Sequence, residues 1–177
     1  MKSYTPQCGL EKSVVYVGVS FYDRELVENA ASRNKDAIFY IIGPFEYSSH
    51  DNVCYLGSLK KNDFEKYLLN ATVGIAPIIQ PEKDVLYGYT GKIISYMKYL
   101  LPVVATNSSN YLNVDGFYIC HEADEFARRI RACLDMTNDE RLRLKNGYLS
   151  VLTKFELNQC KKVLMNYINF NLTEAQK

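Results

Sequence analysis

Short apolar runs alternate along this chain with segments whose apolar residues recur at helical spacing. The runs are rich in β-branched and aromatic residues and lack polar alternation, which is typical of strands buried on both faces of a sheet. They predict strands at residues 14–17, 37–42, 53–56, 73–76, 103–105 and 116–119. Helices are predicted from residues 20, 62 and 90 onward, and at about residues 124–134, 139–152 and 156–170.

Strands separated by helices of this length predict right-handed crossovers between parallel strands. We therefore expect an α/β fold, with a Rossmann-like parallel sheet and helices on both faces. The chain of 177 residues has no long Pro/Gly/Ser linker, so residues 1–177 are expected to form one domain. In such folds ligands bind outside the carboxyl ends of the strands, where the strand order reverses.

Three helix starts carry capping-box spacing, with a polar N-cap followed three residues later by an acidic residue. The predicted pairs are Ser20 with Asp23, Asn62 with Glu65, and Thr137 with Glu140.

The stretch Thr90–Thr106 combines a polar helix start with an apolar helix and a short β-rich run. Thr90 is a good N-cap, Gly91 lets a ligand approach closely, and Lys92 lies in the first turn. A lysine there adds a full charge to the partial positive charge of the helix N-terminus, which suits a phosphate or diphosphate. A buried amphipathic helix with a solvated lysine is the alternative interpretation.

Other candidate residues follow the predicted strands. Gly18 and Ser20 could offer close backbone approach and free N–H groups to a phosphate, although a plain strand-to-helix turn explains them as well. Leu56 and Gly57 could receive the face and edge of a base.

The loop at residues 80–89 precedes the Lys92 helix and carries Tyr87 and Tyr89. It could fold over a bound ligand, with a tyrosine stacking on the base. A solvated loop is the alternative.

Composition limits the remaining possibilities. A net charge of +1 gives no case for nucleic-acid binding. No apolar run reaches transmembrane length, the N-terminus lacks the apolar core of a signal peptide, and five scattered cysteines favour reduced thiols in the cytoplasm. His50 and His121 have no metal-ligand spacing, so no metal site is expected. Most of the fifteen tyrosines are expected at the edge of the core with hydroxyls that reach water.

The segment Lys92–Thr106 resembles the donor-binding segment of GT-B glycosyltransferases, K-L-L-E-Y-M-A-x-G-x-P-V-V-A-T. It departs from that pattern at two positions. Ser95 replaces the acidic residue that holds the ribose, a departure also found in the xanthan-type glucuronosyltransferase branch, and Leu100 replaces a glycine.

Further motifs follow the order of the C-terminal half of these enzymes. An opening strand ends in Gly18, a second ends in Gly43, and the segment Asn52–Gly57 is similar to N-V-x-F-x-G. The segments at residues 64–77 and 116–134 resemble the A-x-V-G-I-x-P and closing strand-and-helix patterns.

The resemblance implies a nucleotide-sugar site, with UDP-sugar as the substrate and no cofactor or metal. The base would lie near Leu56 and Gly57, the ribose near Ser95, and the diphosphate at Gly91, Lys92 and the Gly18–Ser20 turn. Lys92 would stabilise the departing nucleoside diphosphate. No residue is proposed as the catalytic base.

A complete GT-B enzyme also has an N-terminal acceptor-binding domain, for which these residues leave no room. We therefore expect the donor-binding half of a glycosyltransferase, which works with that domain or with a separate subunit. The expected acceptor is a saccharide or a lipid-linked saccharide, with possible peripheral membrane association through the partner. Two alternatives are a non-catalytic nucleotide-binding or interaction module and a GT-B-fold sugar-nucleotide epimerase.

Overall fold

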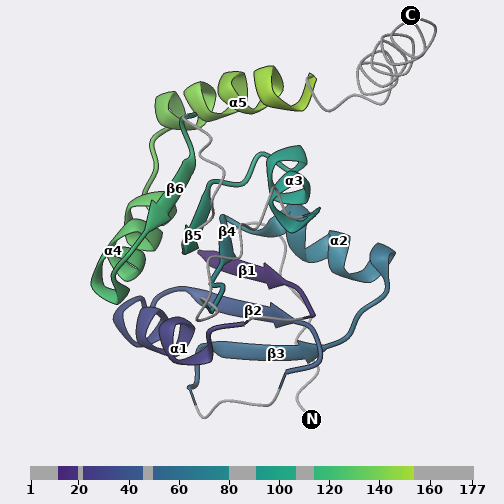
Figure 1. The fold of residues 1–177 in the computed structure, drawn as a ribbon, viewed down its shortest axis with the longest axis vertical. Helices are drawn as coiled ribbons and strands as arrows, with labels where there is room; N and C mark the ends of the chain where they lie inside the picture. The colour runs from purple at the N-terminus through teal and green to yellow at the C-terminus, as the bar shows by residue number, and fades with distance from the viewer. Residues whose placement is uncertain (1–11, 20–21, 46–49, 80–90, 107–113, 154–177) are drawn as a thin grey trace, which may run out of the picture.

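The computed structural model describes residues 12–19, 22–45, 50–79, 91–106 and 114–153 (Figure 1). In these ranges the chain forms strands and helices in the following order: β1 (Ser13–Val17), α1 (Arg24–Arg33), β2 (Ile38–Ile42), β3 (Val53–Gly57), α2 (Lys61–Asn70), β4 (Val73–Ala76), α3 (Gly91–Lys98), β5 (Val103–Thr106), β6 (Phe117–Cys120), α4 (Ala123–Leu134) and α5 (Asn138–Leu152). The strands agree with the predicted runs to within one residue at each end.

The strands form one six-stranded sheet in the order β3-β2-β1-β4-β5-β6, and all neighbouring pairs are parallel. The first three strands extend the sheet in one direction, and β4 then returns to the other side of β1. The order therefore reverses between β1 and β4, which is where a ligand site is expected in this kind of sheet. The predicted α/β fold with a parallel sheet is confirmed.

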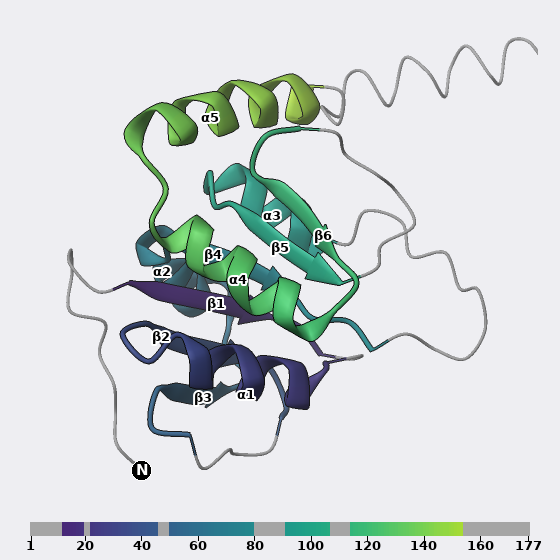
Figure 2. The same ribbon diagram turned by 90° about the vertical axis from the view of Figure 1, so that its left-hand side faces the viewer.

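Helices cover both faces of the sheet. Figure 2 shows α1 and α4 side by side across one face, while α2, α3 and α5 lie on the other. Successive side chains of a strand point to opposite faces, so Val14 and Tyr16 pack toward α1 and α4, and Val15 packs toward α3. Because both faces are covered, the strands are apolar throughout rather than alternating.

The predicted start of α1 at Ser20 is wrong. The helix begins at Arg24, and its N-cap is Asp23, whose carboxylate accepts a hydrogen bond from the Leu26 N–H at 3.0 Å. Tyr22 forms an antiparallel bridge with Ile78, and the Asp23 N–H donates to the Pro77 carbonyl at 2.9 Å. These tertiary contacts hold Tyr22 and Asp23 outside the helix, so the capping signal that the sequence offers at Ser20 does not start it.

The other two capping predictions have opposite outcomes. The N-cap of α2 is Lys60, which makes no side-chain cap, so the predicted capping role of Asn62 is wrong, although the helix begins at Lys61, within one residue of the prediction. In α5, Thr137 and Glu140 form the complete capping box that the sequence predicts. The helix predicted at residues 156–170 lies outside the described residues.

Several tyrosines lie deeper than predicted. Tyr16, Tyr96 and Tyr148 are fully buried, and their hydroxyls bond to protein groups rather than reaching water. The Tyr148 hydroxyl, for example, donates to the Gly116 carbonyl. A buried phenol needs such a partner, because an unsatisfied hydroxyl is costly in the core.

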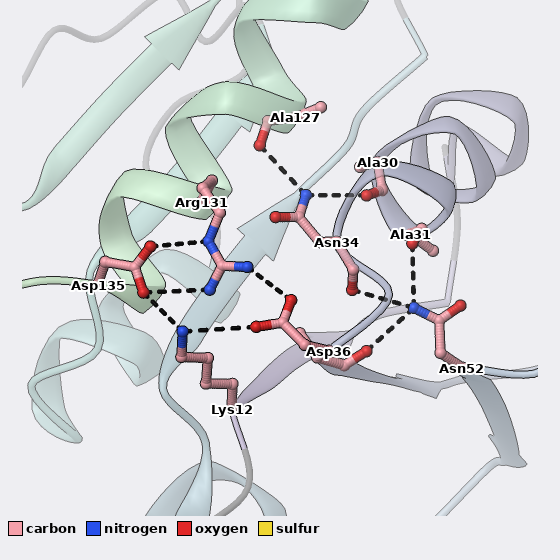
Figure 3. Close-up of polar contacts among 10 residues, drawn as sticks. Lys12, Ala30, Ala31, Asn34, Asp36, Asn52, Ala127, Arg131 and Asp135 are labelled. Carbon is pink, nitrogen blue, oxygen red and sulfur yellow. Dashed lines mark hydrogen bonds and ion pairs between the residues drawn. The ribbon is translucent and has the colours of Figure 1, made fainter.

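A polar network ties α4 to the turn between α1 and β2 (Figure 3). Arg131 donates to Asp36 at 2.6 Å and to Asp135 at 2.8 Å, and Lys12 pairs with both of these carboxylates. Beside it, the buried Asn34 amide donates to a carbonyl of each helix, at Ala30 and Ala127. Lys12 and Asp36 lie just before β1 and β2, so the network is at the amino ends of the strands, opposite the edge where ligands bind.

Candidate functional site

Glycines end or follow the three adjacent strands β1, β2 and β3. The Gly18 N–H donates to the Ile42 carbonyl at 3.0 Å, and the Gly43 N–H donates to the Gly57 carbonyl at 2.9 Å. A Cβ on Gly43 would collide with the Gly18 carbonyl oxygen, whereas a Cβ on Gly57 would meet nothing within 4 Å. The close approach of these backbones therefore requires glycine at position 43.

Lys92 extends from α3 to this same edge. It is the second residue of the helix, and its Nζ donates to the Tyr16 hydroxyl at 3.1 Å. The Nζ also lies 4.6 Å from the centroid of the Tyr16 ring, within cation–π range. A Cβ on Gly18 would be only 2.9 Å from the Nζ. The ammonium group is thus at the carboxyl end of β1, beside the point where the strand order reverses.

The environment of this ammonium group is unusual for a lysine. Burial lowers the pKa of Lys92 from its ordinary value of 10.5 to about 8. In the part of the chain that the structure describes, no ion pair includes Lys92. A partly desolvated cation without a neighbouring carboxylate interacts strongly with an arriving anion, because little of its charge is screened.

Tyr96 fixes the two strands that flank the reversal. Its hydroxyl accepts from the Val17 N–H at 3.0 Å and donates to the Ile75 carbonyl at 3.1 Å, so one phenol links β1 to β4. The ring lies over Gly74, where any Cβ would clash with it. Because Tyr96 is on α3 as well, this contact also fixes the helix that carries Lys92.

Sequence reasoning missed both Tyr16 and Tyr96 as parts of the site. Tyr16 is separated from Lys92 by 76 residues, and no local spacing connects them. The glycines opposite each ring, Gly18 and Gly74, were the available signal, since a glycine in or after a strand marks a close approach.

The other predicted residues lie at differing distances along the edge. Gly91 is exposed at the start of α3, and the Ser95 hydroxyl donates back to the Gly91 carbonyl at 2.8 Å, which commits its proton within the helix.

Gly57 has a left-handed φ of +68° and ends β3, two strands away from β1, and Leu56 before it is partly buried. Ser20, Tyr87, Tyr89 and Thr90 lie outside the described residues.

A pocket of about 490 Å³ occupies another part of the carboxyl edge. It lies between the N-termini of α1 and α4, and its lining includes Asp23, Glu25, Glu122 and the exposed His121, but not Lys92. Its three carboxylates would repel a diphosphate. Of these two parts of the carboxyl edge, the one with Lys92 therefore has the charge that suits an anion.

Two further findings concern the described residues. Within them, no group of three or more His, Cys, Asp or Glu side chains is arranged to hold a metal ion. Nor does any helix of the described chain have the length and apolar character needed to cross a membrane.

The fold is shared with a known class of enzymes. The sheet with helices on both faces is the Rossmann-like α/β fold found in GT-B glycosyltransferases. The family model described as "Glycosyl transferases group 1" matches residues 12–136, which is most of the chain. The chain therefore belongs to the glycosyl transferase group 1 family. No curated protein matches it significantly in sequence.

Solved structures agree on the fold. The C-terminal domain of the glycosyl transferase group 1 family protein LpcC from Francisella tularensis is similar, with a TM-score of 0.59 and 14% identity over 82% of this chain. AviGT4, a glycosyltransferase involved in avilamycin A biosynthesis, has a TM-score of 0.60 and 15% identity over 88% of the chain. The apo structure of OtsA has a TM-score of 0.63 and 13% identity, also over 88%.

This chain spans only part of the larger relatives. It covers 43% of the OtsA chain and 52% of the AviGT4 chain, but 87% of the LpcC structure, which is itself a C-terminal domain. The similarity therefore concerns one domain of a larger architecture.

Proposed function

We propose that this chain is the donor-binding domain of a GT-B glycosyltransferase. The whole enzyme would transfer a sugar from a nucleotide sugar, a UDP-sugar, to a saccharide or lipid-linked acceptor in polysaccharide or glycoconjugate biosynthesis. The observation that carries the proposal is the Lys92 ammonium group, partly buried at the carboxyl end of β1, where the strand order reverses.

The chemistry that this arrangement supports is stabilisation of a leaving group. When the bond between the sugar and the diphosphate breaks, negative charge grows on the diphosphate. A fixed cation aimed at that charge lowers the barrier, because it needs no reorganisation as the reaction proceeds. The first N–H groups of α3 have no partner within the helix and would add to the effect. We propose that these groups replace a metal ion, so no metal or other cofactor is required.

The remaining parts of the donor would extend along the same edge. In this proposal the diphosphate lies at Gly18, Ser20, Gly91 and Lys92, the ribose lies near Ser95, and the base lies near Leu56 and Gly57. Thr90, Tyr87 and Tyr89 would complete the donor site. The serine at position 95 is the feature that favours the xanthan-type glucuronosyltransferase branch, so UDP-glucuronate is the first donor to compare with UDP-glucose.

The proposed enzyme needs a second domain. The chain covers about half of the larger relatives, so we propose that an acceptor-binding domain, on the same polypeptide or on a separate subunit, completes the active site. The assembly would act in the cytoplasm, with any contact to the inner face of the membrane made through that partner.

Calorimetric titration with UDP tests the proposal. Lys92→Ala should weaken UDP affinity by about ten- to a hundredfold, the range expected when a hydrogen bond to a charged group is lost. Lys98→Ala is the matched control, because Lys98 is an exposed lysine at the other end of the same helix. Its affinity should equal that of the wild type. If the Lys92→Ala variant bound UDP as tightly as the wild type does, the result would contradict the proposal.

One observation favours a second function, a non-catalytic nucleotide-binding or interaction module. Ser95 lacks the carboxylate that holds the ribose, and its hydroxyl proton is committed to the Gly91 carbonyl. Unchanged UDP affinity in Lys92→Ala would favour this second function.

A further inference from the structure

Lys92 has a specific partner within the protein. Its Nζ is 3.1 Å from the Tyr16 hydroxyl and 4.6 Å from the centroid of the same ring. Both distances place the ammonium group at the hydroxyl end of one ring, so the hydrogen bond fixes its position there. Gly18 leaves the space in which they meet, since a Cβ there would lie 2.7 Å from the ring atom that bears the hydroxyl and 2.9 Å from the Nζ.

Tyr16 is itself held firmly. It is fully buried in β1, a central strand that pairs with β2 on one side and β4 on the other. Its ring packs against Tyr22, with centroids 4.9 Å apart, and against Phe45, with centroids 5.6 Å apart. The hydroxyl that meets Lys92 is therefore part of the rigid core rather than of a flexible surface.

Such an arrangement has a consequence for binding. A free lysine side chain loses much rotamer freedom when it binds a ligand, which weakens affinity. A lysine that is already ordered loses less conformational entropy on binding. Tyr16 is also a weak competitor, because a neutral hydroxyl binds an ammonium group less strongly than a charged phosphate oxygen does. The ammonium could therefore turn to an arriving diphosphate without losing a strong partner.

We propose that Tyr16 is the positioning residue for Lys92, and that its hydroxyl and ring hold the ammonium group at the carboxyl end of β1 ready for the donor diphosphate. This inference rests on the proposed function, since it takes the diphosphate of a nucleotide as the ligand of Lys92. Tyr16 acts through the lysine in this account and does not itself contact the donor.

A double-mutant cycle on the full chain tests the inference, with UDP and uridine as probes. Tyr16→Phe keeps the ring and removes the hydroxyl. It should weaken UDP affinity by about two- to tenfold, the range for one hydrogen bond, and leave uridine affinity unchanged. In the Lys92→Ala background, adding Tyr16→Phe should have no further effect, because the lysine through which it acts is gone.

Tyr148→Phe is the matched control. It removes another buried hydroxyl, one that bonds to the Gly116 carbonyl between β5 and β6, away from Lys92. It should lower the melting temperature and leave UDP affinity unchanged. Thermal unfolding of every variant separates loss of affinity from loss of fold.

The possible failures are distinguishable. If the wild type binds UDP and Lys92→Ala weakens it, but Tyr16→Phe does not, the proposed function stands and the role of Tyr16 is overturned. An effect of Tyr16→Phe that persists at full size in the Lys92→Ala background would also overturn it, because a purely structural role predicts that result. If the wild type does not bind UDP at all, the proposed function fails, and this inference fails with it.

Discussion

At the scale of single residues, Lys92 combines two properties that oppose each other. Partial burial makes its charge more effective toward an anion, yet burial also disfavours the charged form and lowers the pKa of the lysine to about 8. At pH 7 the ammonium group is still protonated. The protein thus keeps the charge while removing much of the water that would screen it, and the Tyr16 hydroxyl provides one hydrogen-bond acceptor in exchange.

This lowered pKa predicts a pH dependence of donor binding. A diphosphate prefers the protonated lysine, so UDP affinity should be nearly constant from pH 7 to about 8. Above the pKa of the free protein it should weaken by up to about tenfold for each pH unit, because binding must then restore the proton. Calorimetric titration between pH 7 and 9 measures the slope.

Lys92→Arg provides the control for this prediction. A guanidinium group stays charged throughout that range, so affinity in the variant should not fall with pH in this window. Parallel pH profiles for the wild type and Lys92→Arg would mean that another group titrates, and the prediction would be wrong.

At the scale of elements, the end of α3 explains one departure from the family pattern. The Leu101 N–H bonds to the Tyr96 carbonyl, and the Leu100 N–H bonds to the Met97 carbonyl, both at 3.0 Å. These two bonds form a Schellman motif, which places Leu100 in the left-handed region with φ of +57°. Leu100 replaces the glycine of the donor-binding pattern, so the departure is in sequence only, and the backbone keeps the conformation that favours glycine.

This conformation predicts a stabilising substitution. A non-glycine residue in the left-handed region costs about 1–2 kcal/mol, and Leu100, which is 36% exposed, offsets only part of this cost by burying the rest of its side chain. Leu100→Gly should therefore raise the free energy of unfolding by about 1 kcal/mol in denaturant titration. Leu100→Ala keeps the strained backbone and should give no such gain. An equal gain from both variants would indicate that the leucine side chain, rather than its φ, is unfavourable.

The elements also show how far local patterns predict structure. The apolar runs gave all six strands and the Thr137 capping box gave the start of α5, since both signals depend on residues close in sequence. The start of α1 and the N-cap of α2 were not predicted. At α1, the bridge between Tyr22 and Ile78 overrules the capping signal at Ser20, and the two bridged residues are 56 positions apart in the sequence. At α2, Lys60 occupies the N-cap without making a side-chain bond, so the helix start carries no capping signature.

At the scale of the whole molecule, the carboxyl and amino ends of the strands, which form two opposite edges of the sheet, differ in their charged groups. The carboxyl edge has glycines and a lysine that no ion pair of the described residues includes. The amino edge is linked by Lys12, Asp36, Arg131 and Asp135. All four side chains of this network are partly exposed to solvent, from 33% for Arg131 to 57% for Asp36, so its contribution to stability is expected to be small and sensitive to salt.

The network predicts a stability change without a functional one. The hydrogen bond from Arg131 lowers the pKa of Asp36. The hydrogen bonds from Lys12 and Arg131 lower the pKa of Asp135. Carboxyls with a lowered pKa in the folded state stabilise it above their unfolded pKa, and this contribution is lost as the pH falls through the folded value. Arg131→Met should thus lower the melting temperature slightly at pH 7, but less at pH 3 or in high salt.

UDP affinity is the second measurement on this variant. Because the network lies at the edge opposite Lys92, Arg131→Met should bind UDP as the wild type does. Weaker binding would mean that the two edges of the sheet are coupled.

What this sequence determined by itself is local: six buried strands, the helices between them, and a lysine in the first turn of α3. Hydrophobic periodicity and helix-end chemistry act between near neighbours, so they can be read along the chain. The tertiary structure alone decided that β4 returns beside β1, and that Tyr16 and Lys92 meet across 76 residues in the space left by Gly18. Contacts of this kind depend on the order of strands in the sheet, and no short segment of sequence encodes that order.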